Sequence, residues 1–278
     1  MERQEGAGEE NGRQRKYGDF FKMFDVFRHD ERIVTCQLHA RHRRLTVIVL
    51  DRAFRASGRL VNTMKESEKK TIDSFHELYF NGLEGETNSH LRTLWMGFPC
   101  QKCPLDLWIY QEIFAEIRPD LIVEAGTFHG GSALYMAHVL DVLGKGEIIT
   151  IDAVERSPRP IHPRIRYVTG SSGDGNLIDQ LLCTRPNDEV RLVILDSDHS
   201  KNHVSQELRL LAPFVTIGSY LIVEDTCVNG HPILQSFGDG PFEAVEEFLK
   251  TNTNFIVDSS REKLLLTYNP NGFLKRIG

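Results

Sequence analysis

The sequence predicts an α/β protein with a doubly wound, mostly parallel seven-stranded sheet, an antiparallel C-terminal hairpin and a helical N-terminal extension. Short apolar strands, such as 121–124 and 192–196, alternate with helical patterns along the chain. This alternation is typical of a parallel sheet whose two faces are covered by helices. With 278 residues, 40% of them hydrophobic and 26% charged, the chain can bury one large core.

The first third of the chain is expected to lie outside the sheet domain. Residues 1–16 are rich in Gly, Glu, Gln, Arg and Asn, and we expect a disordered tail, because so few apolar side chains cannot offset the entropy of ordering. Residues 17–94 are expected to form a mostly helical extension, with helices over 20–27 and 65–80. The sheet domain then spans 95–278.

The sheet domain opens with a helix. Pro104 is favoured in a first helical turn, apolar residues follow at helical spacing, and Pro119 ends the pattern. The next elements are expected in the following order: strand 121–124, helix 130–143, strands 148–152, 166–169 and 192–196, helix 203–211, strand 220–224 and helix 242–250.

Two further strands are expected at the C-terminal end, over 255–257 and 264–268. The polar turn between them is too short for a crossover, so the two strands must be antiparallel. A parallel sheet closed by such a hairpin is, by analogy of fold, the architecture of class I methyltransferases rather than of most nicotinamide dehydrogenases.

Composition excludes several classes of protein. The net charge of −6 argues against a nucleic-acid-binding protein, although 41–44 form a short basic run. No apolar run approaches the roughly 20 residues that cross a bilayer, and no apolar secretory core follows Met1, so we expect a cytoplasmic protein. The cysteines number five, an odd count, and are expected to be reduced; Cys100 and Cys103 have metal-site spacing but no second pair.

A glycine turn follows the first parallel strand. Residues 124–132 join the strand to a helix, and Gly126 and Gly130 permit a tight backbone and close approach of a ligand. The motif is not G-x-G-x-x-G, and Glu124 at the strand end would repel a pyrophosphate. A cationic ligand without phosphate fits better, and S-adenosylmethionine carries both a sulfonium and an ammonium. A tight turn with a purely structural role stays open as the alternative.

Two further positions complete this donor site. Asp152 ends the next strand, where a carboxylate accepts hydrogen bonds from ribose hydroxyls. Ser172 lies in the polar loop after the third strand, which would border the adenine. Solvent exposure at a loop is the alternative for both.

Acidic residues also end the fourth and fifth strands, at Asp196, Asp198, Glu224 and Asp225, which places up to four carboxylates at one edge of the sheet. Like charges this close are costly unless a cation compensates them, and oxygen ligands favour Mg²⁺. Such an ion would lower the pKa of an acceptor hydroxyl, and His199 would then take the proton. Alternatively, His199 caps the following helix and the acids are solvated; a minor possibility pairs His199 with His203 at an iron site.

Three stretches carry a resemblance to a known family. They are Trp95-x-Gly97, residues 104–112 (PLDLWIYQE) and residues 118–133 (RPDLIVEAGTFHGGSA). With these motifs, the chain over 95–268 resembles the cephalosporin hydroxylase/rhamnosyl O-methyltransferase family. The resemblance implies a class I S-adenosylmethionine fold, Mg²⁺ dependence, O-methylation of small molecules or sugars, and a homo-oligomer.

The chain is also similar, more remotely, to catechol-type O-methyltransferases. That resemblance implies donor-site roles for Glu124 and Ser132, and His199 falls where those enzymes carry a catalytic lysine. Phe128 stands where the nearer family is expected to have a smaller residue, which would narrow the donor pocket. The full set of expected cofactor-binding residues is Glu124, Gly126, Thr127, Phe128, Gly130, Ser132, Asp152 and Ser172, and the expected metal ligands are Asp196, Glu224 and Asp225.

The functional hypothesis is an S-adenosylmethionine-dependent, Mg²⁺-assisted O-methyltransferase that acts on a hydroxyl of a small molecule or sugar. His199 and Asp196 are its expected catalytic residues. The alternatives are a cephalosporin-hydroxylase-like enzyme of secondary metabolism and a non-catalytic assembly protein that retains the fold. The acids and His199 argue against a site without activity.

Overall fold

The computed structural model of the protein describes residues 64–83 and 88–278. The expected tail over 1–16 and the expected helix over 20–27 lie outside the described residues, so the boundaries proposed for them stay predictions. The helix expected over 65–80 is present as α1 (Glu66–Asn81). Among the described residues, no helix is both long and apolar enough to cross a membrane.

The centre of the molecule is a seven-stranded sheet in the order β5-β4-β3-β6-β7-β9-β8. The first five of these strands are parallel, and β9 runs antiparallel to both of its neighbours. The predicted fold class is thus confirmed. The strands are β3 (Leu121–Ala125), β4 (Glu147–Asp152), β5 (Ile165–Thr169), β6 (Arg191–Leu195), β7 (Tyr220–Val223), β8 (Phe255–Val257) and β9 (Phe273–Arg276).

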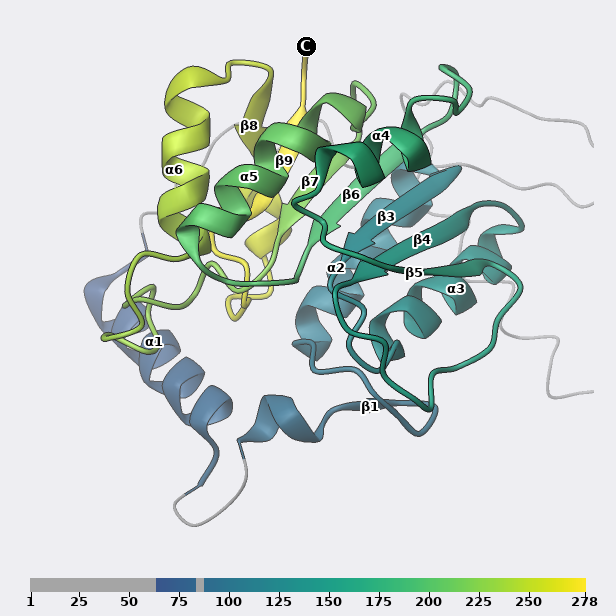
Figure 1. Cartoon of the computed structure of the whole chain (residues 1–278). Coiled ribbons are helices and arrows are strands. Elements are labelled where there is room, and N and C mark those ends of the chain that lie inside the picture. The colour runs from purple at the N-terminus through teal and green to yellow at the C-terminus, as the bar shows by residue number, and fades with distance from the viewer. Residues whose placement is uncertain (1–63, 84–87) are drawn as a thin grey trace, which may run out of the picture. The chain divides into compact units, whose positions relative to one another are not determined.

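Helices cover both faces of the sheet (Figure 1). One face carries α4 (Gly175–Leu182), α5 (Lys201–Leu211) and α6 (Pro241–Thr251), and the other carries α2 (Pro104–Ile117) and α3 (Gly131–Leu143). Strand β3 shows why both layers form. Val123 packs into the first layer and Ile122 into the second, so every position of this apolar strand is buried. The short elements are η1 (Ser89–Arg92), β1 (Leu94–Trp95), β2 (Phe98–Pro99), η2 (Ala212–Phe214) and η3 (Ser259–Glu262).

The predicted C-terminal hairpin is wrong in one of its strands. Residues 264–268 form no strand, and β8 instead pairs with β9. Leu265 has a left-handed backbone (φ 72°), which a strand does not accommodate, and the backbone N–H of Tyr268 donates to Asp106 rather than to a ladder. The apolar run is used for packing, because Leu266 and Tyr268 are buried beside α1.

Helix α1 packs on this C-terminal segment. The ring of His76 is stacked on that of Tyr268, with centroids 5.5 Å apart, and Phe80 meets the same ring edge-on. A segment near residue 80 is therefore joined to one near residue 268, beside the cavity described next.

Candidate active site

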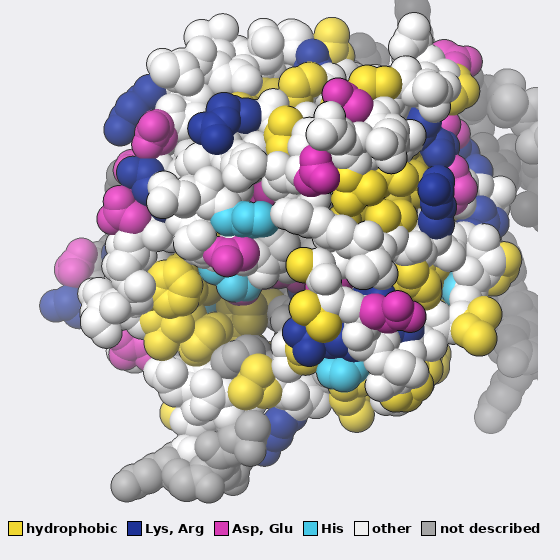
Figure 2. Space-filling model, viewed as in Figure 1, with side chains coloured by type: hydrophobic (Ala, Val, Ile, Leu, Met, Phe, Trp, Pro, Cys, Tyr) yellow, Lys and Arg dark blue, Asp and Glu magenta, His cyan; other side chains and the backbone are white. Residues whose placement is uncertain are grey.

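The carboxyl ends of the parallel strands open onto a cavity of about 550 Å³. Nine of the predicted site residues line it, and these are Gly126, Thr127, Phe128, Ser132, Asp152, Ser172, Asp196, His199 and Asp225. Glu124, Gly130 and Glu224 do not line it. On this face of the molecule, histidine and acidic side chains are exposed together, beside hydrophobic side chains on the α1 side (Figure 2).

Gly126 and Gly130 shape the backbone around the cavity. A Cβ on Gly126 would meet the carbonyl oxygen of Asp196 at 1.7 Å, so the ends of β3 and β6 approach as closely as they do only because this residue is glycine. Gly130 has φ 77°, is the N-cap of α3, and lies against Tyr167 and Pro160. The predicted tight turn is present, and Gly130 serves its backbone rather than the cavity surface.

Glu124 lies beneath the cavity floor and is fully buried. Ser132 and Thr150 donate hydrogen bonds to its two carboxylate oxygens, at 2.5 and 2.6 Å. Burial raises its pKa, against the opposing effect of Lys102. Thr127 in turn contacts Thr150 at 2.7 Å between their hydroxyl oxygens. Glu124 therefore links the end of β3 to α3 and β4 through hydrogen bonds. Its carboxylate lies behind the cavity surface and not on it.

Asp152 is held by the same turn from the other side. The backbone N–H of Phe128 donates to Asp152 Oδ2 at 2.7 Å, and that of Val154 donates to Oδ1 at 2.9 Å. Phe128 adopts a left-handed backbone (φ 48°), which directs this N–H to the carboxylate. The Phe128 ring lines the cavity, and the guanidinium carbon of Arg156 lies 5.1 Å from its centroid. Asp152 is thus fixed at the cavity wall.

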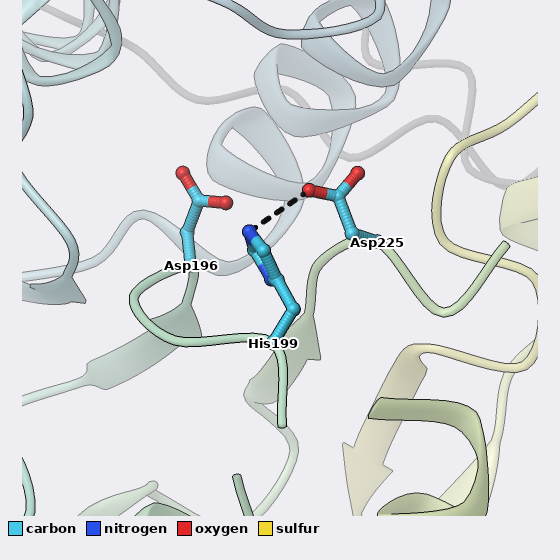
Figure 3. Close-up of side chains that lie close together, drawn as sticks. All are labelled: Asp196, His199 and Asp225. Atoms are coloured by element: carbon cyan, nitrogen blue, oxygen red, sulfur yellow. Dashed lines mark ion pairs between the residues drawn. The ribbon is translucent and has the colours of Figure 1, made fainter. Parts of the chain in front are cut away.

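Asp196, His199 and Asp225 form a compact group in which one ligand atom from each lies within 4.8 Å of the others (Figure 3). His199 Nε2 is 3.2 Å from Asp225 Oδ2 and points between the two carboxylates. Burial raises the pKa of Asp196 to about 7, with Lys102 opposing and the carboxylates of Glu224 and Asp225 adding to the shift. Two carboxylates and an imidazole at this spacing could hold a divalent cation.

Glu224 is not part of this group of three, and its carboxylate contacts two residues that sequence reasoning missed. Lys102 Nζ lies 2.7 Å from Glu224 Oε1 and 2.7 Å from Asp196 Oδ2. The Tyr110 hydroxyl donates a hydrogen bond to Glu224. Burial alone would lower the pKa of Lys102, but the carboxylates of Asp196 and Glu224 outweigh it and raise the pKa. Nothing in the sequence around Lys102, which lies between Cys100 and Cys103, indicates that it pairs with the acidic residues of the site.

A third residue that sequence reasoning missed is Glu207, on the inner face of α5. It is fully buried and accepts hydrogen bonds from Ser172 and Ser197, at 2.5 and 2.6 Å. His203 Nε2 lies 3.3 Å from the same oxygen. His203 contacts Glu207 and is not part of the group formed by Asp196, His199 and Asp225. Among the described residues, the structure therefore does not assemble the iron site of His199 and His203 that was considered from the sequence.

The sheet order, the terminal antiparallel strand and a ligand cavity at the carboxyl edge together define a class I methyltransferase fold. A family model described as Rhamnosyl O-methyltransferase/CmcI matches residues 88–277. The chain belongs to this family, and the resemblance stated from its motifs is confirmed.

Relatives and solved structures agree with this assignment. Proteins named rhamnosyl O-methyltransferase from Mycobacterium bovis and Mycobacterium tuberculosis are 38% identical to the chain over 211 residues, which is 73% of this chain and 84% of theirs. The Mycobacterium leprae protein of the same name is 36% identical over 210 residues, or 73% of this chain and 90% of its own.

Two solved structures share the fold. One is described as a CmcI-N160 apo-structure, with a TM-score of 0.54 and 19% identity over 71% of this chain and 81% of that one. The other is described as cmcI-D160 Mg-SAM, with a TM-score of 0.54 and 20% identity over 71% and 82%.

Proposed function

We propose that this protein is an S-adenosylmethionine-dependent, Mg²⁺-assisted O-methyltransferase that acts on a hydroxyl group of a sugar. One observation carries the proposal: a single cavity contains both the turn that holds Asp152 and the group of Asp196, His199 and Asp225. A donor site and an acceptor-activating site therefore adjoin each other. The names of the relatives, and the ligands in the description of the cmcI-D160 structure, support the same assignment.

The residues at the first part of the cavity fit the methyl donor. Asp152 has both carboxylate oxygens held by backbone N–H groups and is placed to accept hydrogen bonds from ribose hydroxyls. The buried carboxylate of Glu124 favours positive charge above it, which suits a sulfonium or an ammonium. The volume of about 550 Å³ lies within the usual range for small-molecule sites, roughly 300–1,000 Å³.

The second part fits a divalent cation. Asp196 and Asp225 would hold Mg²⁺ together with oxygens of water and the acceptor, and when bound the ion would lower the pKa of the acceptor hydroxyl. The raised pKa of Asp196, caused by burial and neighbouring carboxylates, indicates that this group is short of positive charge. Glu224 was expected as a third ligand, and its ion pair with Lys102 favours a supporting role instead.

His199 would take the proton of the acceptor hydroxyl at Nε2. This atom points into the group, and Asp225 at 3.2 Å would stabilise the imidazolium that forms. As the proton leaves, the acceptor oxygen would gain charge and form a bond to the methyl carbon, while the carbon–sulfur bond on the opposite side breaks and its electron pair leaves with the sulfur as S-adenosylhomocysteine. Side chains that exclude water from this step line the remaining wall, and they are Phe80, Leu91, Val228, Leu234, Phe237 and Tyr268.

A binding and turnover experiment tests the proposal. Titration calorimetry should show binding of S-adenosylhomocysteine and no comparable binding of NAD⁺. Transfer of a labelled methyl group to a panel of sugar glycosides should stop with EDTA and recover with Mg²⁺. Tight NAD⁺ binding without S-adenosylhomocysteine binding would refute the donor assignment, and transfer that persists in EDTA would refute the role of the metal.

We further propose that the enzyme is a homo-oligomer that works in the cytoplasm. Light scattering of the purified protein and fractionation of the cells that produce it would test these two points. A monomer, or recovery outside the cytoplasm, would contradict them.

A further inference from the structure

Glu207 is a buried carboxylate that contacts the cavity only through other side chains. It lies behind the wall, with no exposed surface, while Ser172, Ser197 and His203 in front of it all line the cavity. Each of these three side chains contacts the same carboxylate oxygen, Glu207 Oε1. Among the described residues, the other oxygen of Glu207 is buried without a hydrogen-bond partner.

The chemistry of these contacts fixes the direction of two protons. The hydroxyls of Ser172 and Ser197 both donate to this carboxylate oxygen, at 2.5 and 2.6 Å. A serine hydroxyl has one proton, and here both protons point away from the cavity. The two hydroxyls can therefore offer a ligand only lone pairs, and on Ser172 one of these also lies 3.3 Å from His203 Nε2.

The position of the two serines identifies the part of the donor that meets them. Ser172 follows β5, the neighbour of β4, and β4 ends at Asp152, where we place the ribose. The loop that carries Ser172 is held to α5, since Gln206 Nε2 donates to the carbonyl of Gly173 at 2.7 Å. The nucleobase of the donor, beyond the ribose, would lie against this wall between the loop and α5.

We propose that Glu207 is a positioning residue that makes the site selective for an aminopurine. It holds the Ser172 and Ser197 hydroxyls as acceptors, which suit the exocyclic amino group of adenine. The 6-oxo group of hypoxanthine would face these lone pairs with no proton between them. This inference rests on the proposed function, because it assumes that the cavity binds an adenosyl donor.

The size of the preference follows from the cost of an unpaired polar atom. Leaving a buried acceptor without a donor weakens binding by about ten- to hundredfold. S-adenosylhomocysteine should therefore bind at least about tenfold more tightly than S-inosylhomocysteine, which differs from it only in the base.

The substitution Glu207→Leu tests the inference. Leucine accepts no hydrogen bond, so both serine hydroxyls lose the acceptor at Oε1 and are free to donate toward the cavity. In this variant we expect the ratio of the two dissociation constants, measured by titration calorimetry, to fall several-fold toward unity. The matched control is Gln206→Leu on the same helix, which loosens the loop of Ser172 without reversing any donor. It should weaken both ligands alike and leave the ratio unchanged.

The outcomes are separable. If the wild-type protein binds neither homocysteine derivative, the proposed function fails. If wild type and Glu207→Leu both bind S-adenosylhomocysteine, and the two dissociation constants keep the same ratio, the positioning role of Glu207 is refuted. Should Glu207→Leu not fold, Ser172→Ala provides the second test: losing one acceptor should reduce the preference for adenine, and an unchanged ratio would refute the inference.

Discussion

Lys102 Nζ lies 2.7 Å from Glu224 Oε1, and the side chains of both residues are only 3% exposed. The same ammonium reaches Asp196 at 2.7 Å. A fixed cation is thus built into a group of acidic residues that would otherwise repel one another. The acidic site can form before any divalent ion binds, because part of its charge is already neutralised.

Replacing Lys102 by an uncharged residue should lower the free energy of unfolding of the protein. Lys102→Met leaves the buried Glu224 with a hydrogen bond from Tyr110 but without its counter-charge, and breaking a buried ion pair costs about 3–5 kcal/mol. Chemical denaturation should show this loss in the metal-free protein, and Mg²⁺ should recover more stability in the variant than in wild type. The control Lys145→Met removes a partly exposed pair with Asp120 and should cost no more than about 1 kcal/mol. A small loss at Lys102, unaffected by Mg²⁺, would contradict the role.

His199→Ala should slow methyl transfer while sparing donor binding. Loss of a general base lowers kcat by about 10²–10⁴-fold, whereas His199 is not needed to hold the ribose or the base. Single-turnover kinetics and calorimetry with S-adenosylhomocysteine measure the two effects separately. His129→Ala is the control, since His129 does not line the cavity. Equal kcat values in His199→Ala and wild type would exclude His199 as the base.

Gly126→Ala should prevent the cavity from forming. The added Cβ would meet the Asp196 carbonyl oxygen at 1.7 Å, and the residue has φ 95°, so both space and backbone oppose the change. We expect a fall in the thermal midpoint and loss of S-adenosylhomocysteine binding. Gly144→Ala separates the two causes, because Gly144 has φ 75° but nothing within 4 Å of an added Cβ. If Gly126→Ala and Gly144→Ala lower the thermal midpoint equally, the close approach of β3 and β6 does not explain the effect of Gly126→Ala.

The stability of the protein should depend on pH through His76. Burial lowers the pKa of His76 to about 4, against a smaller opposing effect of Asp73, and its Nε2 has no partner among the described residues. The folded pKa lies below the unfolded value of about 6.5, so the unfolded chain binds the proton first as the pH falls. The stabilisation by neutral His76 is therefore complete above about pH 6.5 and is lost between about pH 6.5 and 4.

The measurement is urea unfolding of wild type and of His76→Phe across this range. Phenylalanine keeps a ring on Tyr268 and does not titrate, so the free energy of unfolding of wild type should fall relative to the variant by up to about 3 kcal/mol. Parallel curves for the two proteins would show that His76 does not titrate in the folded state as described.

The parts of the fold that follow from local sequence pattern could be predicted. The parallel strands and α3 were predicted to within a residue or two, because apolar runs and the glycines around α3 act locally. The strand expected over 264–268 could not be distinguished from a packed loop, because its apolar side chains are buried against α1 and not in the sheet. Which surface covers an apolar run is decided by tertiary contacts.

The candidate site also contains residues that could be predicted from the sequence and residues that could not. The turn from Gly126 and the acids at the strand ends could be predicted, because topology brings strand ends together. Lys102 lies 94 positions before Asp196, and Glu207 lies 35 positions after Ser172, so no spacing links them. The ion pair between Glu224 and Lys102 likewise could not be predicted, and the expected role of Glu224 as a metal ligand stays a prediction.

The packing of α1 on Tyr268 changes where the chain can be shortened. Phe80 is part of the cavity wall and reaches it from a helix that begins at Glu66, well before the first strand of the sheet. A gene trimmed to start at Trp95 would encode the whole sheet, yet it would leave one side of the acceptor region open to water. A shortened version of this enzyme should therefore keep helix α1, which begins at Glu66.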